Sequence, residues 1–114
     1  MLFRSVPDPA ERAFLLQNLV FDGPEASWRL NLAAIERGMP ALAEFPAVAA
    51  GAAYDGPALF VAGGRSDYLR PEHEPKIRRL FPNARVERIA GAGHWVHAER
   101  PREFLDLVEP FLNR

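Results

Sequence analysis

The spacing of hydrophobic residues divides the chain into a helical first half and a mixed second half. Apolar residues cover one broad face over residues 9–21, and Asp8 before the proline at position 9 predicts the start of a helix. Helical spacing returns over residues 26–38, where Gly38 is expected to end the second helix. A further helical turn over residues 40–45 is left open. The first half therefore predicts helices with apolar faces.

The second half alternates short apolar runs with amphipathic segments. Residues 57–64 form an apolar run that ends in two glycines, which is typical of a strand buried on both faces of a parallel sheet. Residues 84–91 predict a second strand. Residues 71–81 and 101–112 predict helices, each with a proline at its start. The order indicates an α/β fold with a right-handed strand-helix-strand-helix unit and parallel strands.

Composition narrows the class of protein. The chain has 114 residues, 48% of them hydrophobic and 25% charged, as in one small globular domain. The net charge of −1 with interleaved signs predicts no nucleic acid partner. Apolar runs too short for a bilayer predict no membrane partner. The chain has no cysteine and its first residues do not resemble a signal peptide. We therefore expect a cytoplasmic protein without a cofactor.

Two unusual loops follow the two predicted strands. The first is "GGRSDYLRP" over residues 63–71, and the second is "GAGHWVH" over residues 91–97. Functional residues of parallel sheets lie at the carboxyl ends of the strands, and these ends meet at one edge of the sheet. We therefore expect Asp67 and His94 to come close together. A carboxylate that accepts a hydrogen bond from an imidazole is the second half of a Ser-His-Asp triad.

Other interpretations of these residues stay open. His94 and His97 could bind a metal with Glu99 or Asp67 as the third ligand. A histidine in a loop is also often structural, as we expect for His97 beside the last helix, and His73 is predicted to be a surface residue of a helix. The paired glycines match neither a dinucleotide-binding motif nor a P-loop.

The stretches "PALFVAGGRSDYLRP" and "LFPNARVERIAGAGHWVHAERPREFLDLVEPFL" resemble the C-terminal portion of an α/β-hydrolase. They are most similar to small bacterial and mitochondrial esterases that carry GGxS and AGHWVHAE-P motifs. The resemblance is strong over residues 55–114 and weaker before them. It implies cap-like helices over residues 1–50 and the strand-helix-strand-helix unit of the hydrolase core over residues 51–114.

The resemblance also assigns catalytic roles. His94 matches the triad histidine, which acts as general base and then as general acid. Asp67 matches the usual acid position after the penultimate strand. Some members of the esterase group take the acid from an earlier loop, and there the serine at the place of Ser66 helps to hold the histidine. The substrate implied is a small acyl ester or thioester.

The nucleophile motif of this fold, G-x-S-x-G, is absent from the sequence. The serines are Ser5, Ser27 and Ser66, and Ser66 comes nearest, in G-R-S-D-Y. We therefore expect the chain to be the C-terminal half of a serine ester hydrolase that lacks its nucleophile and is inactive alone. The alternative is a truncated, non-catalytic module that forms homo-oligomers or pairs with a missing N-terminal half.

Overall fold

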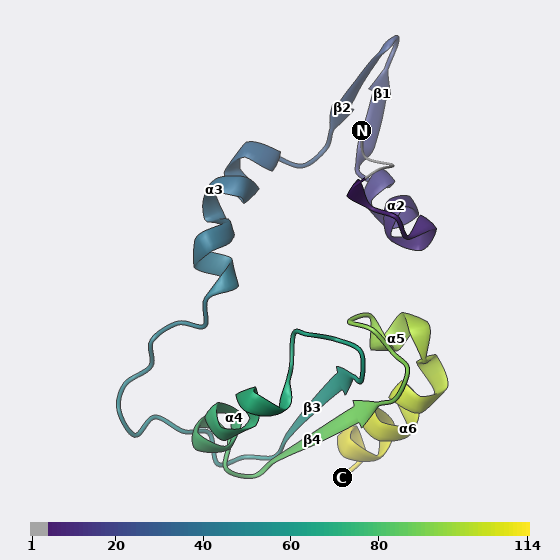
Figure 1. The fold of residues 1–114 in the computed structure, drawn as a ribbon. Helices are drawn as coiled ribbons and strands as arrows, with labels where there is room; N and C mark the ends of the chain where they lie inside the picture. Colours follow the sequence, from purple (N-terminus) through teal and green to yellow (C-terminus); the bar gives the residue numbers. More distant parts are fainter. Residues whose placement is uncertain (1–4) are drawn as a thin grey trace. The chain divides into compact units, whose positions relative to one another are not determined.

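The computed structural model describes residues 5–114, which fall into two compact units (Figure 1). The N-terminal unit extends to Ala47, and the C-terminal unit is Val48–Arg114. Each unit has its own two-stranded sheet.

The first helix of the N-terminal unit is α2, Pro9–Leu16. The side chain of Asp8 accepts hydrogen bonds from the backbone N–H groups of Ala10, at 2.7 Å, and Glu11, at 3.2 Å. These bonds satisfy N–H groups that have no partner within the helix. The predicted helix start is confirmed, but the helix is shorter than the pattern indicated.

A β-hairpin follows where the hydrophobic spacing predicted helix. Strand β1, Leu19–Asp22, pairs antiparallel with β2, Glu25–Trp28. The two-residue loop between them has Gly23 at φ 64°, while Pro24 has a negative φ. That pair of signs fits a type II′ turn, which matches the twist of paired strands. The helical prediction was wrong here because the Gly-Pro turn and the β-branched and aromatic residues beside it favour a hairpin.

Helix α3, Leu32–Ala43, completes the regular structure of the N-terminal unit. The side chain of Asn31 accepts a hydrogen bond from the backbone N–H of Ala34 at 3.0 Å and caps the helix. The prediction that Gly38 ends this helix was wrong. Gly38 lacks the positive φ with which glycine ends helices, and the helix continues through Pro40.

The C-terminal unit contains the predicted parallel sheet. Strand β3, Ala58–Gly63, pairs in parallel with β4, Ala84–Ile89, from Ala58 opposite Ala84 to Gly63 opposite Ile89. Both arrows point the same way in Figure 1. The first strand was predicted from its apolar run, the second from the imperfect alternation of Val86 and Ile89 with charged residues, and the parallel direction from the order of the elements; all three predictions are confirmed.

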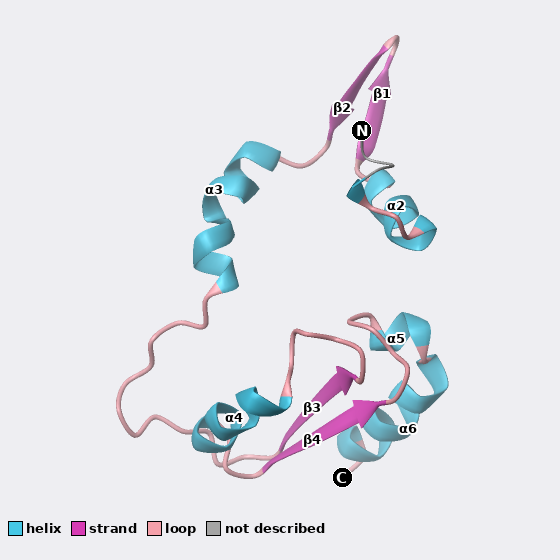
Figure 2. Cartoon of the chain, viewed as in Figure 1, coloured by secondary structure: helices cyan, strands magenta, loops and turns pink. Residues whose placement is uncertain are grey.

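Helices connect and follow these strands, as Figure 2 shows. A short 3₁₀ turn η1, Pro71–His73, leads into α4, Glu74–Leu80, between β3 and β4. After β4 come α5, Val96–Glu99, and α6, Pro101–Leu112. The predicted order of strand, helix, strand and helix is confirmed, with α5 as one additional short helix.

The two faces of the β3–β4 sheet pack against different helices. Successive residues of a strand point to opposite faces, so Val61 and Phe60 lie on opposite sides. Phe60 meets Phe81, just after α4, edge to face at 5.3 Å between ring centroids. The other face packs on α6 through a cluster of apolar residues: Ile89, Ala92 and Val96 are buried, with Val61, Phe104 and Leu107 against them.

Within residues 5–114, no helix combines the length and the apolar character needed to cross a membrane.

Candidate active site

The candidate site lies at the carboxyl ends of β3 and β4. The loop after β3, residues 64–70, and the loop after β4, residues 90–95, leave the sheet at the same end (Figure 1). We call them the acid loop and the histidine loop, because they carry Asp67 and His94. Their common position follows from the parallel strands, whose carboxyl ends meet at one edge.

Backbone hydrogen bonds join the acid loop to the end of β4 and to the histidine loop. The N–H of Gly64 donates to the carbonyl of Ile89 at 2.8 Å. The N–H of Arg65 donates to the carbonyl of Ala92 at 2.9 Å. Ala92 is completely buried in the core beside α6. The start of the acid loop is therefore fixed to the part of the histidine loop that is anchored in the core.

A glycine at the end of β3 allows the loops to come this close. A Cβ atom at Gly63 would lie 1.9 Å from the backbone oxygen of Gly93 and 2.5 Å from that of Ala92. No side chain can be accommodated at such distances, so the histidine loop rests directly on the backbone of β3.

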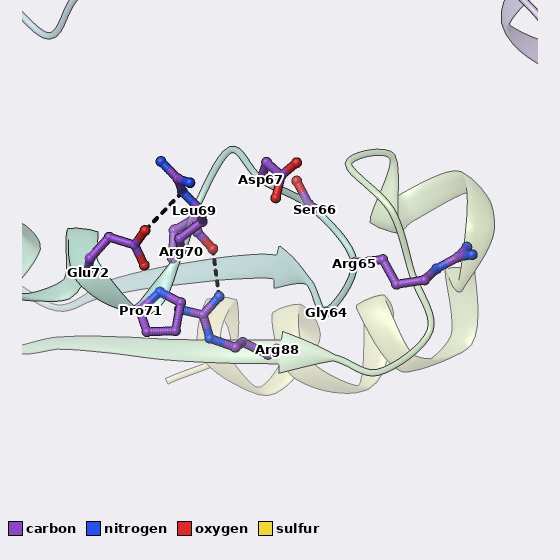
Figure 3. A pocket seen from close by; sticks show the side chains of 9 residues that line it. All are labelled: Gly64, Arg65, Ser66, Asp67, Leu69, Arg70, Pro71, Glu72 and Arg88. Carbon is purple, nitrogen blue, oxygen red and sulfur yellow. Dashed lines mark hydrogen bonds and ion pairs between the residues drawn. The ribbon is translucent and has the colours of Figure 1, made fainter.

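The acid loop surrounds a small cavity, shown in Figure 3. The cavity measures about 280 Å³ and is lined by residues 64–67 and 69–72 of the loop and its continuation, together with Arg88 of β4. The side chains of Ser66 and Asp67 lie next to each other, whereas Arg65 points away from them. Ser66 is half-buried and Asp67 is exposed. The Ser66 hydroxyl oxygen accepts a hydrogen bond from the backbone N–H of Tyr68 at 3.2 Å.

Arg88 fastens the far end of the acid loop. Its guanidinium donates to the carbonyl oxygen of Leu69 at 2.6 Å, and it pairs with the carboxylate of Glu74 at 2.9 Å. The first of these bonds is drawn in Figure 3. A charged donor makes a stronger hydrogen bond than a neutral one, so Arg88 limits the movement of the loop away from β4.

The histidine loop is held by Glu99 and presents His94 at the surface. The Glu99 carboxylate accepts a hydrogen bond from the backbone N–H of Gly93, directly before His94. The side chain of His94 is exposed, and its ring stacks on Tyr68 of the acid loop. The ring centroids are 4.0 Å apart and the planes are inclined by 27°.

The structure thus brings the predicted residues to one end of the sheet without a direct bond between them. Within the described part of the chain, no hydrogen bond or ion pair joins Asp67 to His94; the contact between the two loops that reaches His94 is the ring of Tyr68. The triad roles of His94 and Asp67, and the supporting role of Ser66, remain predictions.

The described residues do not form the metal site that the sequence left open as an alternative. Residues 5–114 contain no group of three histidine, aspartate or glutamate side chains arranged to bind a metal ion. Glu99 is engaged by Gly93, and His97 meets Phe104 edge to face at 6.3 Å between ring centroids. His73, predicted as a surface helix residue, is half-buried in η1, where its Nδ1 accepts a hydrogen bond from the Arg70 N–H at 3.1 Å.

Three residues that organise the site were missed in the sequence. Tyr68 stacks on His94, Arg88 fastens the acid loop, and Glu99, considered only as a metal ligand, fixes the histidine loop. Tyr68 had a usable signal, because it is the one aromatic residue of the loop and directly follows Asp67. Glu99 also had a signal, as the glutamate of the AGHWVHAE-P motif, whereas Arg88 had none, because a charged residue on a strand is usually solvated.

The sequence of the chain is similar to known hydrolases. Residues 1–107 match the profile of the Alpha/beta hydrolase family. The chain is 44% identical over 107 residues to the sn-1-specific diacylglycerol lipase ABHD11 of Mus musculus, covering 94% of this chain and 34% of that protein. It is 37% identical over 100 residues to Esterase YbfF of Escherichia coli (strain K12), covering 88% of this chain and 37% of that protein.

A solved structure shows the same relationship. The structure of a marine microorganism esterase is similar with a TM-score of 0.85 and 31% sequence identity, covering 96% of this chain and 42% of that one. The chain therefore spans about a third of the length of the curated relatives that it matches. The strand order, the parallel sheet and these matches agree: the chain belongs to the alpha/beta hydrolase family.

Proposed function

We propose that this chain contributes the histidine and the acid of a serine carboxylic-ester hydrolase. The observation that carries the proposal is the position of His94, exposed on the loop after β4 and in contact with the loop that holds Asp67. The names of the relatives, an esterase and a diacylglycerol lipase, support ester hydrolysis as the reaction.

Each residue has a defined task in this proposal. The imidazole of His94 takes the proton of a serine hydroxyl as that oxygen attacks the ester carbonyl, and then gives the proton to the leaving alcohol. The carboxylate of Asp67 accepts a hydrogen bond from the second ring nitrogen and stabilises the imidazolium. Ser66 beside it is the alternative partner of the histidine.

The nucleophile comes from outside these 114 residues, because none of the serines lies in the motif G-x-S-x-G. The substrate is a small acyl ester or thioester, which reacts through an acyl-enzyme formed on that serine. A cytoplasmic location, favoured by the cysteine-free composition, completes the proposal.

The test combines this chain with the remainder of a relative. The complete 114-residue chain replaces the matching segment of Esterase YbfF, and hydrolysis of p-nitrophenyl butyrate is measured. We expect turnover in the hybrid and none in the remaining YbfF segment alone. His94→Ala should reduce kcat by at least about 10³-fold, as the loss of a triad member does. An active hybrid with an undiminished His94→Ala variant would exclude the triad role.

A second candidate function is that of an association module. Its support is the apolar surface of the N-terminal unit, where these large side chains are exposed: Phe14, Leu15, Phe21, Leu30, Leu32, Ile35, Met39, Leu42 and Phe45. Surfaces of this kind drive association. Light scattering of the purified chain tests self-association, since a stable oligomer without turnover supports this function and a monomer counts against it.

A further inference from the structure

Tyr68 is an exposed aromatic residue in an unusual position. Three quarters of its surface, 75%, is accessible, yet its ring lies against the imidazole of His94 with 4.0 Å between the ring centroids. An exposed tyrosine without tethers would sample several rotamers. The position of this ring therefore depends on how its backbone is held.

Tethers on both sides hold the backbone of Tyr68. Its own N–H donates to the Ser66 hydroxyl oxygen at 3.2 Å. The next residue, Leu69, has its carbonyl bound by Arg88 at 2.6 Å, and Arg88 is itself paired with Glu74. The loop thus presents the phenol ring of Tyr68 to the histidine loop from a restrained stretch of chain.

The geometry of the contact leaves the reactive atoms of the histidine free. A stacked ring occupies the face of the imidazole, while the two nitrogens exchange protons in the plane of the ring. The contact therefore restricts rotation of His94 without occupying Nδ1 or Nε2. The backbone on the other side is also restrained, because Gly93 is bound by Glu99.

We propose that Tyr68 is a positioning residue, whose ring holds the imidazole of His94 in one orientation. The inference rests on the proposed function for its catalytic meaning, but the restraint itself is a property of this chain. A restrained base spends more of its time in the geometry that proton transfer needs.

The first test measures the histidine ring directly by NMR in the 114-residue chain. Selective ¹³C labelling of histidine gives the ring-proton shifts and the order parameter of the His94 ring. We expect upfield ring-current shifts and an ordered ring in the native chain and in Tyr68→Phe, and loss of both in Tyr68→Leu. Identical shifts and order in the native chain and Tyr68→Leu would overturn the inference.

The chain offers a matched control in Tyr54. It is also exposed, but its ring lies against Phe81, at 6.2 Å between centroids, away from the histidine loop. Tyr54→Leu should leave the His94 signals unchanged. Backbone amide shifts of β3 and β4 report whether each variant keeps the native fold, as we expect for substitutions of exposed side chains. Loss of the His94 signals only in a variant with displaced strand shifts would also count against the inference.

The second test uses the hybrid with Esterase YbfF. Tyr68→Leu should lower kcat about tenfold with KM almost unchanged, and Tyr68→Phe should restore kcat, because the phenyl ring keeps the stacking surface. An active hybrid with equal kcat in all three forms would overturn the positioning role and leave the proposed function intact. An inactive hybrid would count against the proposed function, while the NMR measurement still decides the restraint.

Discussion

The two units of the chain are stabilised in different ways. In the C-terminal unit six hydrophobic residues are buried, and helix α6 packs on the β3–β4 sheet. In the described part of the N-terminal unit no residue is buried, and α2, the hairpin and α3 are held mainly by local hydrogen bonds and caps. Short isolated helices and hairpins are marginal in water. The difference indicates that the C-terminal unit can keep the candidate site in place, whereas the N-terminal unit depends on further contacts.

The largest change in stability is expected from a glycine-to-alanine substitution in the C-terminal unit, compared with the same substitution in the N-terminal unit. Gly63→Ala places a Cβ within 1.9 Å of a backbone oxygen, so we expect a loss of about 4 kcal/mol or more in the free energy of unfolding of the C-terminal unit. Gly38→Ala meets no atom within 4 Å in helix α3 and should stabilise that helix by about 0.5–1 kcal/mol. Urea titration followed by circular dichroism measures both. An equally mild effect at both positions would contradict the close approach at Gly63.

The next largest change in stability is expected from truncating an isoleucine in each unit. Ile89 is 6% exposed and Ile35 is 41% exposed. Ile89→Ala removes packing in the core and should cost about 2–4 kcal/mol, whereas Ile35→Ala should change stability by at most about 0.5 kcal/mol. Hydrogen exchange of the β3 and β4 amides should accelerate only in the first variant. Equal losses would show that the N-terminal unit has a core of its own in solution.

The smallest effect is expected at the start of helix α2. Asp8→Ala removes the acceptor for two backbone N–H groups and should cost about 1 kcal/mol of local helix stability. Amides of α2 should exchange faster, while the exchange of amides in β3 and β4 stays the same. Asp8→Asn, which keeps an acceptor oxygen, is the matched control. A simultaneous loss in the C-terminal unit would show that the two units unfold together.

The sequence predicted the C-terminal unit better than the N-terminal unit for a physical reason. Strand β3 is a short apolar run, and β4 carries Val86 and Ile89 among charged residues, so the two patterns report a more covered and a less covered strand. In the N-terminal unit β1 and β2 mix apolar and polar side chains and none of them is buried, so a helical period could be fitted to them as well as a strand period. The Gly23-Pro24 turn was the signal that should have decided for the hairpin.

The candidate site was predictable in its position but not in its contacts. Parallel strands bring Asp67 and His94 to one edge of the sheet, and that follows from topology. The stacking of Tyr68 on His94 and the bonds of Arg88 and Glu99 depend on loop conformations, which no periodicity encodes. Side chains that fasten loops are therefore found only once the backbone path is known.

The backbone bonds of the acid loop have a consequence for protein engineering. The loop is attached to the end of β4 and to the histidine loop through the N–H groups of Gly64 and Arg65, whose partners are the carbonyl oxygens of Ile89 and Ala92. These attachments make no use of the side chain at position 65, which is exposed and points away from Ser66 and Asp67. A library that randomises Arg65 to any residue except proline would therefore sample new charges and shapes at the rim of the site while the loop keeps its path.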